Sequence, residues 1–289
     1  MLRRSPSQNA RERTHAERLA SSDGYFSPGS VIRRVGNTPV TPFLGGGTAV
    51  LLQVAHPLVA AGVAEHSSYD ADLWLRLIRT LRALYLITFG SKAEADRAGA
   101  AVQAVHARVN GTTRTALGPF PAGTRYSAGD AQLMLWVHAT LVHASLSVYQ
   151  RFERRLSAPE QERYYDDMAA VARIFGTPAD VIPPTLAEFW DYFAAQITSS
   201  TITVTPPARA IAAMIMRAPL PAPLRLLAPA HRLATAAQLP PRLREEYGLR
   251  WTPLHGPLLA AAAQTVRLGS WPLLQAAGRM RPALALVPT

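Results

Sequence analysis

The spacing of apolar residues predicts a chain built almost entirely of helices. From residue 25 onward, apolar side chains recur at intervals of three and four, the period of a helix that buries one face. Shorter helices separated by prolines should lie between Pro206 and Pro253, and Thr201–Thr205 is the one stretch that locally predicts a strand. Capping residues, glycines and prolines place the longer helices at 70–89, 92–110, 131–156, 160–176, 185–197 and 258–277.

The most apolar run extends from Thr48 to Ala64, directly after Gly45-Gly46-Gly47. Its length approaches the ~20 residues of a membrane-spanning helix. Gln53, His56 and Pro57 interrupt it, however, and polar groups are costly inside a lipid bilayer. We therefore expect one buried helix of a soluble protein, with the glycines at its start and with Gln53 and His56 paired inside the protein.

Length and composition indicate one domain with a sizeable core. The 289 residues are 48% hydrophobic and 17% charged, which is more apolar and less charged than an average globular chain. Residues 1–24 lack apolar periodicity and are expected to form a flexible polar arm. The expected fold is all-α, a single globular multi-helix domain of about eight to ten helices over residues 25–255, with a C-terminal amphipathic helix and tail over 256–289.

The chain is strongly basic, with a formal net charge of +11, and Lys92 is its single lysine. The arginines are scattered, with no lysine-rich run and no aromatic-studded basic strand, so we do not expect nucleic-acid binding. Arginines suit anionic partners such as the carboxylates of a cofactor. A peripheral contact with an anionic membrane surface is also compatible with this charge.

Several absences narrow the chemistry. The chain has no cysteine, which excludes disulfides, zinc–thiolate sites, iron–sulfur clusters and cysteine nucleophiles. It also lacks a P-loop, a Gly-x-Ser-x-Gly elbow and a His-Glu-x-x-His zinc motif. The segment from Met1 to Leu19 is polar and arginine-rich and has no apolar region of a signal peptide, so a cytoplasmic location is expected.

Histidine is the remaining source of metal ligands, and His106 has the most distinctive setting. It lies at helical spacing from the apolar residues Ala98, Val102, Val105 and Val109, which predict a buried stripe. The ring of His106 should then project into the core. A core histidine bonded to a backbone carbonyl would give the same pattern.

Two further groups of polar residues sit on apolar helices. Arg76, Arg79 and Thr80 can share one helical face, which suits an anionic ligand group but also suits a solvated face. His138 and Thr140 lie within the apolar run from Leu135 to Leu141, where buried polar groups need partners. Thr140 can bond back to the carbonyl four residues earlier, and His138 can cap a neighbouring element.

These motifs, taken together, resemble the MpaB-type oxygenase family, which includes the latex-clearing rubber oxygenases. The similarity covers roughly residues 30–255 and depends on the order and spacing of seven segments. They are Gly45–Val63, His66-Ser67, Arg79-Thr80, Phe89-Gly90, Val105–Gly111, Trp136–Leu141 and Tyr247–Trp251.

The resemblance implies an all-α fold around a buried haem b pocket, with dioxygen and a small hydrophobic substrate as partners. The proximal histidine of the rubber oxygenases lies in a segment similar to Val105–Val109, which implies that His106 is the iron ligand. Their distal Arg-x-x-Lys-Thr segment is similar to Arg76–Thr80, and a family threonine corresponds to Thr140. His56 and His138 are further candidates for contact with the cofactor.

One position departs from the family pattern. Arg79 stands where the rubber oxygenases have a lysine that can ligate iron, and a guanidinium has no lone pair to donate. No residue matches the family's distal glutamate. The sequence therefore predicts a haem-dependent oxidoreductase or oxygenase for an isoprenoid- or lipid-like substrate. A haem-binding or haem-sensing protein without turnover, and a membrane-associated helical protein without a cofactor, are the alternatives.

Overall fold

The computed structural model describes residues 23–66, 71–217 and 224–268, and this part of the chain is helical as predicted. The exceptions are two short 3₁₀ turns and one two-stranded antiparallel sheet. Twelve α-helices are described, somewhat more than expected. They are α2 (Val31–Gly36), α3 (Val40–Val54), α4 (Pro57–Glu65), α5 (Ala71–Phe89), α6 (Lys92–Arg108), α7 (Ala131–Phe152), α8 (Ala158–Ile174), α9 (Leu186–Thr198), α10 (Pro206–Met216), α11 (Ala228–Ala237), α12 (Pro241–Glu246) and α13 (His255–Arg267).

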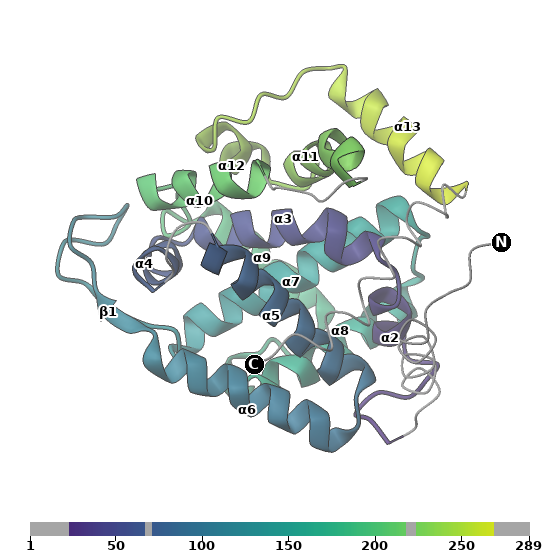
Figure 1. Ribbon diagram of the computed structural model, residues 1–289, viewed down its shortest axis with the longest axis horizontal. Coiled ribbons are helices and arrows are strands. Elements are labelled where there is room, and N and C mark those ends of the chain that lie inside the picture. The colour runs from purple at the N-terminus through teal and green to yellow at the C-terminus, as the bar shows by residue number, and fades with distance from the viewer. Residues whose placement is uncertain (1–22, 67–70, 218–223, 269–289) are drawn as a thin grey trace.

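The helix α3 occupies the centre of the molecule, with α10 to α13 on one side of it and α5 and α6 on the other (Figure 1). Its glycines allow neighbouring helices to approach closely. A Cβ on Gly45 would lie 3.3 Å from Val148 of α7, and one on Gly47 would lie 2.5 Å from the hydroxyl of Thr235 on α11. The prediction that the glycines start the helix is wrong, because they lie inside α3, between α7 and α11.

The apolar run from Thr48 to Ala64 is not one helix. It bends by 104° between α3 and α4, where Pro57 starts the second helix. His56 caps α4 by accepting a hydrogen bond at Nδ1 from the Leu58 N–H at 3.2 Å. The run is mostly buried inside the protein, as expected, but the prediction of a continuous helix is wrong because the proline and its cap end α3.

Donors from other elements satisfy the carbonyl groups at this break. A buried helix end needs such partners, since its last carbonyls have no intrahelical donor. Three bonds supply them: the Tyr247 hydroxyl to Leu51 O at 2.5 Å, the Trp136 indole N–H to Leu52 O at 3.2 Å, and the Thr203 N–H to Ala55 O at 2.8 Å.

Among the described helices, α7 is long and apolar enough to cross a membrane by length and composition, as is α3 with α4 if the bent pair is counted as one span. In this structure α7 packs against α3, α8 and α13. Its side chains are therefore buried on several faces, including Trp136, Ala139 and Val142. This is the pattern of a core helix that other helices surround.

The predicted strand Thr201–Thr205 belongs to no sheet. Ile202 and Val204 are buried, while their backbone groups bond to side chains: Arg242 donates to Ile202 O at 2.7 Å, and the Val204 N–H donates to Glu246 at 2.8 Å. Side chains of α12 thus replace a partner strand. The two strands that do form are β1 (Asn110–Thr112) and β2 (Arg125–Ser127), with Gly111 opposite Tyr126.

The helix ends at α8 and α9 agree closely with prediction, and Ser157 and Glu160 form the expected capping box at the start of α8. Of the predicted polar arm 1–24, only Asp23 and Gly24 lie within the described residues, and Asp23 O accepts from the Lys92 N–H at 2.9 Å. The last helix, α13, starts three residues earlier than expected, and residues 269–289 lie outside the description.

Candidate functional site

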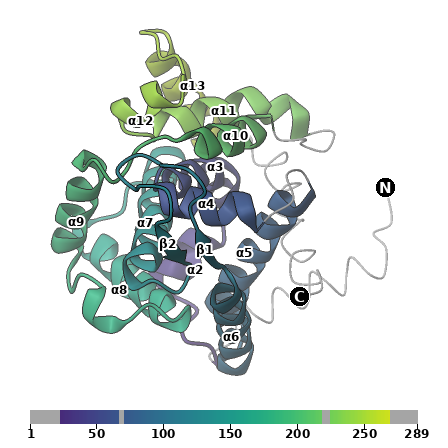
Figure 2. The same ribbon diagram turned by 90° about the vertical axis from the view of Figure 1, so that its left-hand side faces the viewer.

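The helices α5 and α6 carry the candidate cofactor residues and form an antiparallel pair at the edge of the molecule (Figures 1 and 2). Gly90 and Ser91 make the turn, and Ser91 caps α6 in a reciprocal pair with Glu94. Arg76 precedes this turn by about as many residues as His106 follows it. The backbone positions of Arg76 and His106 therefore lie at the same end of the pair.

Side chains on α5 are described from Leu77 onward, so that of Arg76 lies outside the description. Arg79 is exposed, and Thr80 is half-buried. The arginine can therefore reach an anionic group at the surface end of a bound molecule. Thr80 presents a hydroxyl nearer the interior on the same helix.

His106 lies in the last turn of α6 and is half-buried, with its Nδ1 atom shielded from solvent. The predicted buried stripe is wrong in part, because Val105 is 58% exposed and Val102 and Val109 are only half-buried. The reason is position: α6 packs mainly on α5 and α8, so the residues of α6 that are fully buried lie in its first half. His106 thus borders the core rather than lying within it.

A polar cluster lies beside this end of α6, where α4 meets the β1–β2 hairpin. His66 Nε2 is 3.1 Å from Asn110 O, and the Tyr126 hydroxyl donates to the Glu65 carboxylate at 2.5 Å. Burial is the main cause that raises the pKa of Tyr126, and the bond to Glu65 adds to it. This cluster was not predicted, because Glu65 and Tyr126 are far apart in the sequence and only the fold brings them together.

Thr140 and His138 lie on α7, whose main neighbour is α3. The Thr140 hydroxyl bonds back to its own helix as expected, but it donates to Val137 O at 2.7 Å, three residues earlier rather than four. His138 is 4% exposed, and neither ring nitrogen has a hydrogen-bond partner among the described residues. Burial lowers its pKa to about 4. The expectation that His138 caps a neighbour is therefore wrong within the described structure, and its ring is neutral at pH 7.

His56 lies at the bend between α3 and α4, and its Nδ1 is already engaged by the Leu58 N–H. Its ring contacts Phe120 with centroids 5.6 Å apart, and burial lowers its pKa to about 4. Since Nδ1 accepts a hydrogen bond, the proton of the neutral ring is on Nε2. His56 therefore has a structural role, as the N-cap of α4.

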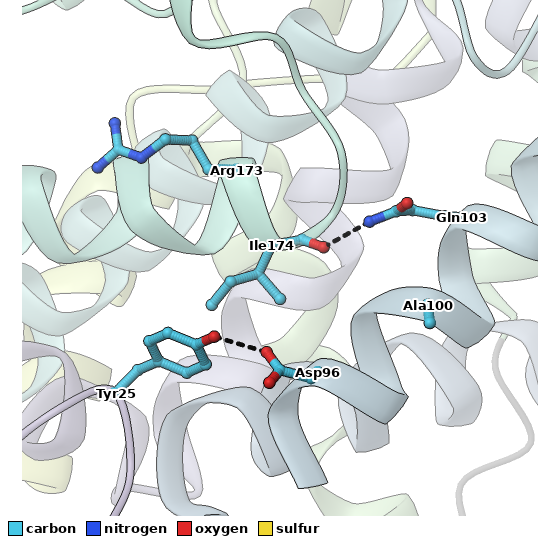
Figure 3. A pocket seen from close by; sticks show the side chains of 6 residues that line it. All are labelled: Tyr25, Asp96, Ala100, Gln103, Arg173 and Ile174. Atoms are coloured by element: carbon cyan, nitrogen blue, oxygen red, sulfur yellow. Dashed lines mark hydrogen bonds between the residues drawn. The ribbon is translucent and has the colours of Figure 1, made fainter. Parts of the chain in front are cut away.

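A surface cleft of about 360 Å³ lies between α6 and α8 (Figure 3). Tyr25 donates to Asp96 at 2.6 Å, and Gln103 donates to Ile174 O at 3.0 Å, so the side chains around the cleft tie α6 to its neighbours. Asp96, Gln103 and Arg173 are all exposed. The cleft lacks the apolar enclosure that a haem needs, and we do not assign the cofactor to it.

The described residues offer a haem iron one candidate ligand, His106. Over the described ranges, no three His, Asp or Glu side chains gather to hold an ion. A haem iron needs only one protein ligand, because the porphyrin supplies four nitrogens. His106, with one ring nitrogen shielded from solvent beside an arginine-bearing helix, fits that requirement.

Comparison with known proteins gives a family and a fold. A latex clearing protein in its closed state is similar in structure, with a TM-score of 0.58 and 18% sequence identity over 96% of this chain and 79% of that chain. No curated protein matches the sequence. The model of the family described as "ER-bound oxygenase mpaB/B'/Rubber oxygenase, catalytic domain" matches residues 33–268. Because this match spans most of the sequence, the chain belongs to the mpaB and rubber oxygenase catalytic-domain family.

Proposed function

We propose that the protein is a haem b-dependent oxygenase that acts on a hydrophobic, isoprenoid- or lipid-like substrate, with His106 as the iron ligand. The family match over residues 33–268 supports the class of reaction. The main support for His106 as the iron ligand is its position, half-buried at the end of α6 and alongside the helix that bears Arg79 and Thr80.

A bound haem would supply the binding and activation of dioxygen for attack on a substrate double bond. His106 would hold the iron through an imidazole nitrogen. The guanidinium of Arg79, exposed at the surface side of α5, would pair with a carboxylate of the cofactor. Thr80 lies one residue further along α5 and is half-buried.

Arg79 also distinguishes this chain from the lysine-bearing rubber oxygenases. A guanidinium stays protonated and has no lone pair for a metal, so Arg79 would not compete with small ligands for a bound iron. We expect the ferrous protein to bind carbon monoxide without a preceding opening step. The variant Arg79→Lys should slow that binding if the new amine reaches the iron.

The first experiment measures haem content. The protein purified after haem-supplemented expression should show a Soret band and close to one haem per chain by the pyridine haemochrome method. His106→Ala should lose that haem while its circular dichroism stays unchanged. The matched control is His255→Ala, since His255 lies on α13 and bonds only locally, to Thr252. Wild-type haem content in His106→Ala would refute the assignment.

A second experiment separates an oxygenase from a haem-binding protein without turnover. The loaded protein is incubated with an isoprenoid alkene under dioxygen, and the carbonyl products of double-bond cleavage are measured by mass spectrometry. We expect products that carry label from ¹⁸O₂ and that disappear under nitrogen. A fully loaded protein that consumes neither dioxygen nor any alkene tested would favour a non-catalytic, haem-sensing role.

A further inference from the structure

The helix α13 is apolar on two opposite faces, and only one of them packs against the protein. On the inner face, Leu259 and Ala263 are buried in a core cluster with residues of α3, α7 and α11. On the outer face, Leu254 is 72% exposed and Leu258 is 57% exposed. Leu268, at the C-terminal end, is 79% exposed. A helix that is apolar on both faces is expected to be covered on both.

The exposed leucines form one surface. At 3.6 residues per turn, Leu254, Leu258 and Leu268 fall within about 80° of one another around the helix axis. Ala261 and Thr265 lie between them and are exposed as well. We call this surface, made of these five residues, the outer face of α13. Leu226 on the neighbouring 3₁₀ turn is 83% exposed, and that turn packs on α11, as α13 does.

The same part of the chain is strongly cationic. From residue 192 to the C-terminus the sequence has ten arginines and only two acidic residues, Glu245 and Glu246. Glu246 is already bonded to Arg242 and to the Val204 N–H. Apart from Arg242, the exposed arginines of this region form no ion pair with a carboxylate within the described residues; they are Arg209, Arg217, Arg232, Arg250 and Arg267.

We propose that the outer face of α13 docks the protein on an anionic lipid bilayer. Exposed leucines on a surface helix can enter the boundary between headgroups and acyl chains, while arginines bind the lipid phosphates. Nucleic acid would use the arginines but not the leucines, whereas a bilayer uses both. The charge and the apolar surface lie in one layer, α10 to α13, on the side of the molecule opposite α6 (Figures 1 and 2).

Vesicle co-sedimentation of the full chain tests this docking, independently of whether His106 binds haem. The vesicles contain either phosphatidylcholine alone or equal parts of phosphatidylcholine and phosphatidylglycerol. We expect strong binding to the mixed vesicles that weakens as salt is added, because salt screens the attraction between arginines and phosphates. Arg232→Gln combined with Arg250→Gln should weaken that binding, with little change on neutral vesicles.

Leu258→Glu should lower partitioning into the mixed vesicles about tenfold or more, since it removes a leucine that would enter the bilayer and brings a negative charge to an anionic surface. Val105→Glu is the matched control, because Val105 is 58% exposed and lies on α6, at the opposite side of the molecule. This control should bind as the wild type does. Circular dichroism checks that both variants keep their helices.

Five outcomes would overturn the proposal. The first three are no binding to either kind of vesicle, equal loss in Leu258→Glu and Val105→Glu, and loss with the arginine variants but not with Leu258→Glu, which would indicate a general polyanion surface. The fourth is a wild-type dimer by light scattering that Leu258→Glu dissociates, which would make this face a contact between two copies. Binding that appears only after removal of residues 269–289 would likewise contradict it, because that segment would then cover the face.

Discussion

The centre of the molecule and its α5–α6 edge use their polar residues differently. At the centre, three polar groups of the family-like segments are bonded to the fold: Trp136 and Tyr247 cap carbonyls of α3, and His56 caps α4. His138 is buried there as well, with no hydrogen-bond partner among the described residues. At the edge, Arg79 and His106 lie partly open on helices that pack on few neighbours. The segments that resemble a family therefore contain residues that build the fold as well as residues that can bind a ligand. A buried side chain that is hydrogen-bonded to the protein belongs to the first group.

The largest effect should come from the centre. Trp136→Ala removes a fully buried side chain that stacks on Phe193 and donates to the end of α3, so we expect a loss of about 3–5 kcal/mol in the free energy of unfolding. Urea denaturation followed by circular dichroism measures it. Trp136→Phe keeps most of the ring and should recover part of the loss. A change below about 1 kcal/mol in Trp136→Ala would mean that the centre is not organised as described.

Gly47→Ala should destabilise the protein by about 1–3 kcal/mol, because the added Cβ would lie 2.5 Å from the Thr235 hydroxyl oxygen. Thr235→Ala removes the atoms in the way, and its own cost should be small since that hydroxyl has no hydrogen-bond partner among the described residues. The double variant should therefore be more stable than the sum of the single changes predicts. Strict additivity of the two changes would contradict the close approach of α3 and α11.

His138 should make stability depend on pH. Its folded-state pKa is about 4, below the 6.5 of an exposed histidine, so the unfolded chain binds the proton first as pH falls. The contribution is complete above pH 6.5 and is lost as pH falls from there toward 4, by at most about 1.4 kcal/mol per pH unit. His56 and His231 have similarly lowered pKa values and add to the same trend. His138→Leu should flatten the dependence of unfolding free energy on pH between 7 and 5, and parallel curves for the two proteins would refute this.

Changes in the polar cluster of Glu65 and Tyr126, beside the α5–α6 edge, should affect stability least. Tyr126→Phe removes the hydrogen bond to Glu65 and should cost about 1 kcal/mol. Arg114→Gln should stay within about 0.5 kcal/mol, because the Arg114 side chain is 89% exposed and its contact with Glu65 is 3.9 Å long. Thermal denaturation of both variants measures these effects. A loss as large as that of Trp136→Ala in either variant would erase the distinction between centre and edge.

The helices could be predicted from the sequence because their signals are local. The start of α8 is an example: Ser157 and Glu160 are three residues apart, and their capping box is present. The break at His56 and Pro57 was misjudged, since whether a proline bends a buried run depends on distant donors such as Trp136 and Tyr247. The prediction of a strand at Thr201–Thr205 was wrong for a similar reason: the hydrogen-bond partners of its backbone are side chains of α12.

The candidate site was predictable only in part. Position along α5 and α6 follows from two helices and a short turn, so the alignment of Arg76 with His106 needed no long-range information. The exposure of Val105 could not be predicted, because periodicity shows that a helix face is apolar but not whether another helix covers it. The Glu65–Tyr126 pair joins α4 to β2, and no local pattern of residues predicts that contact.

Ligand rescue tests the central claim, that His106 at the α5–α6 edge holds the iron, most directly. His106→Gly is purified with and without imidazole, and the Soret band and haem content per chain are recorded. His138→Gly and His66→Gly, which alter the buried histidine of α7 and the cluster beside α6, serve as controls. We predict that His106→Gly alone loses haem and that imidazole restores it. Two results would contradict this assignment: haem retained in His106→Gly without imidazole, or haem lost in His138→Gly or His66→Gly and restored there by imidazole.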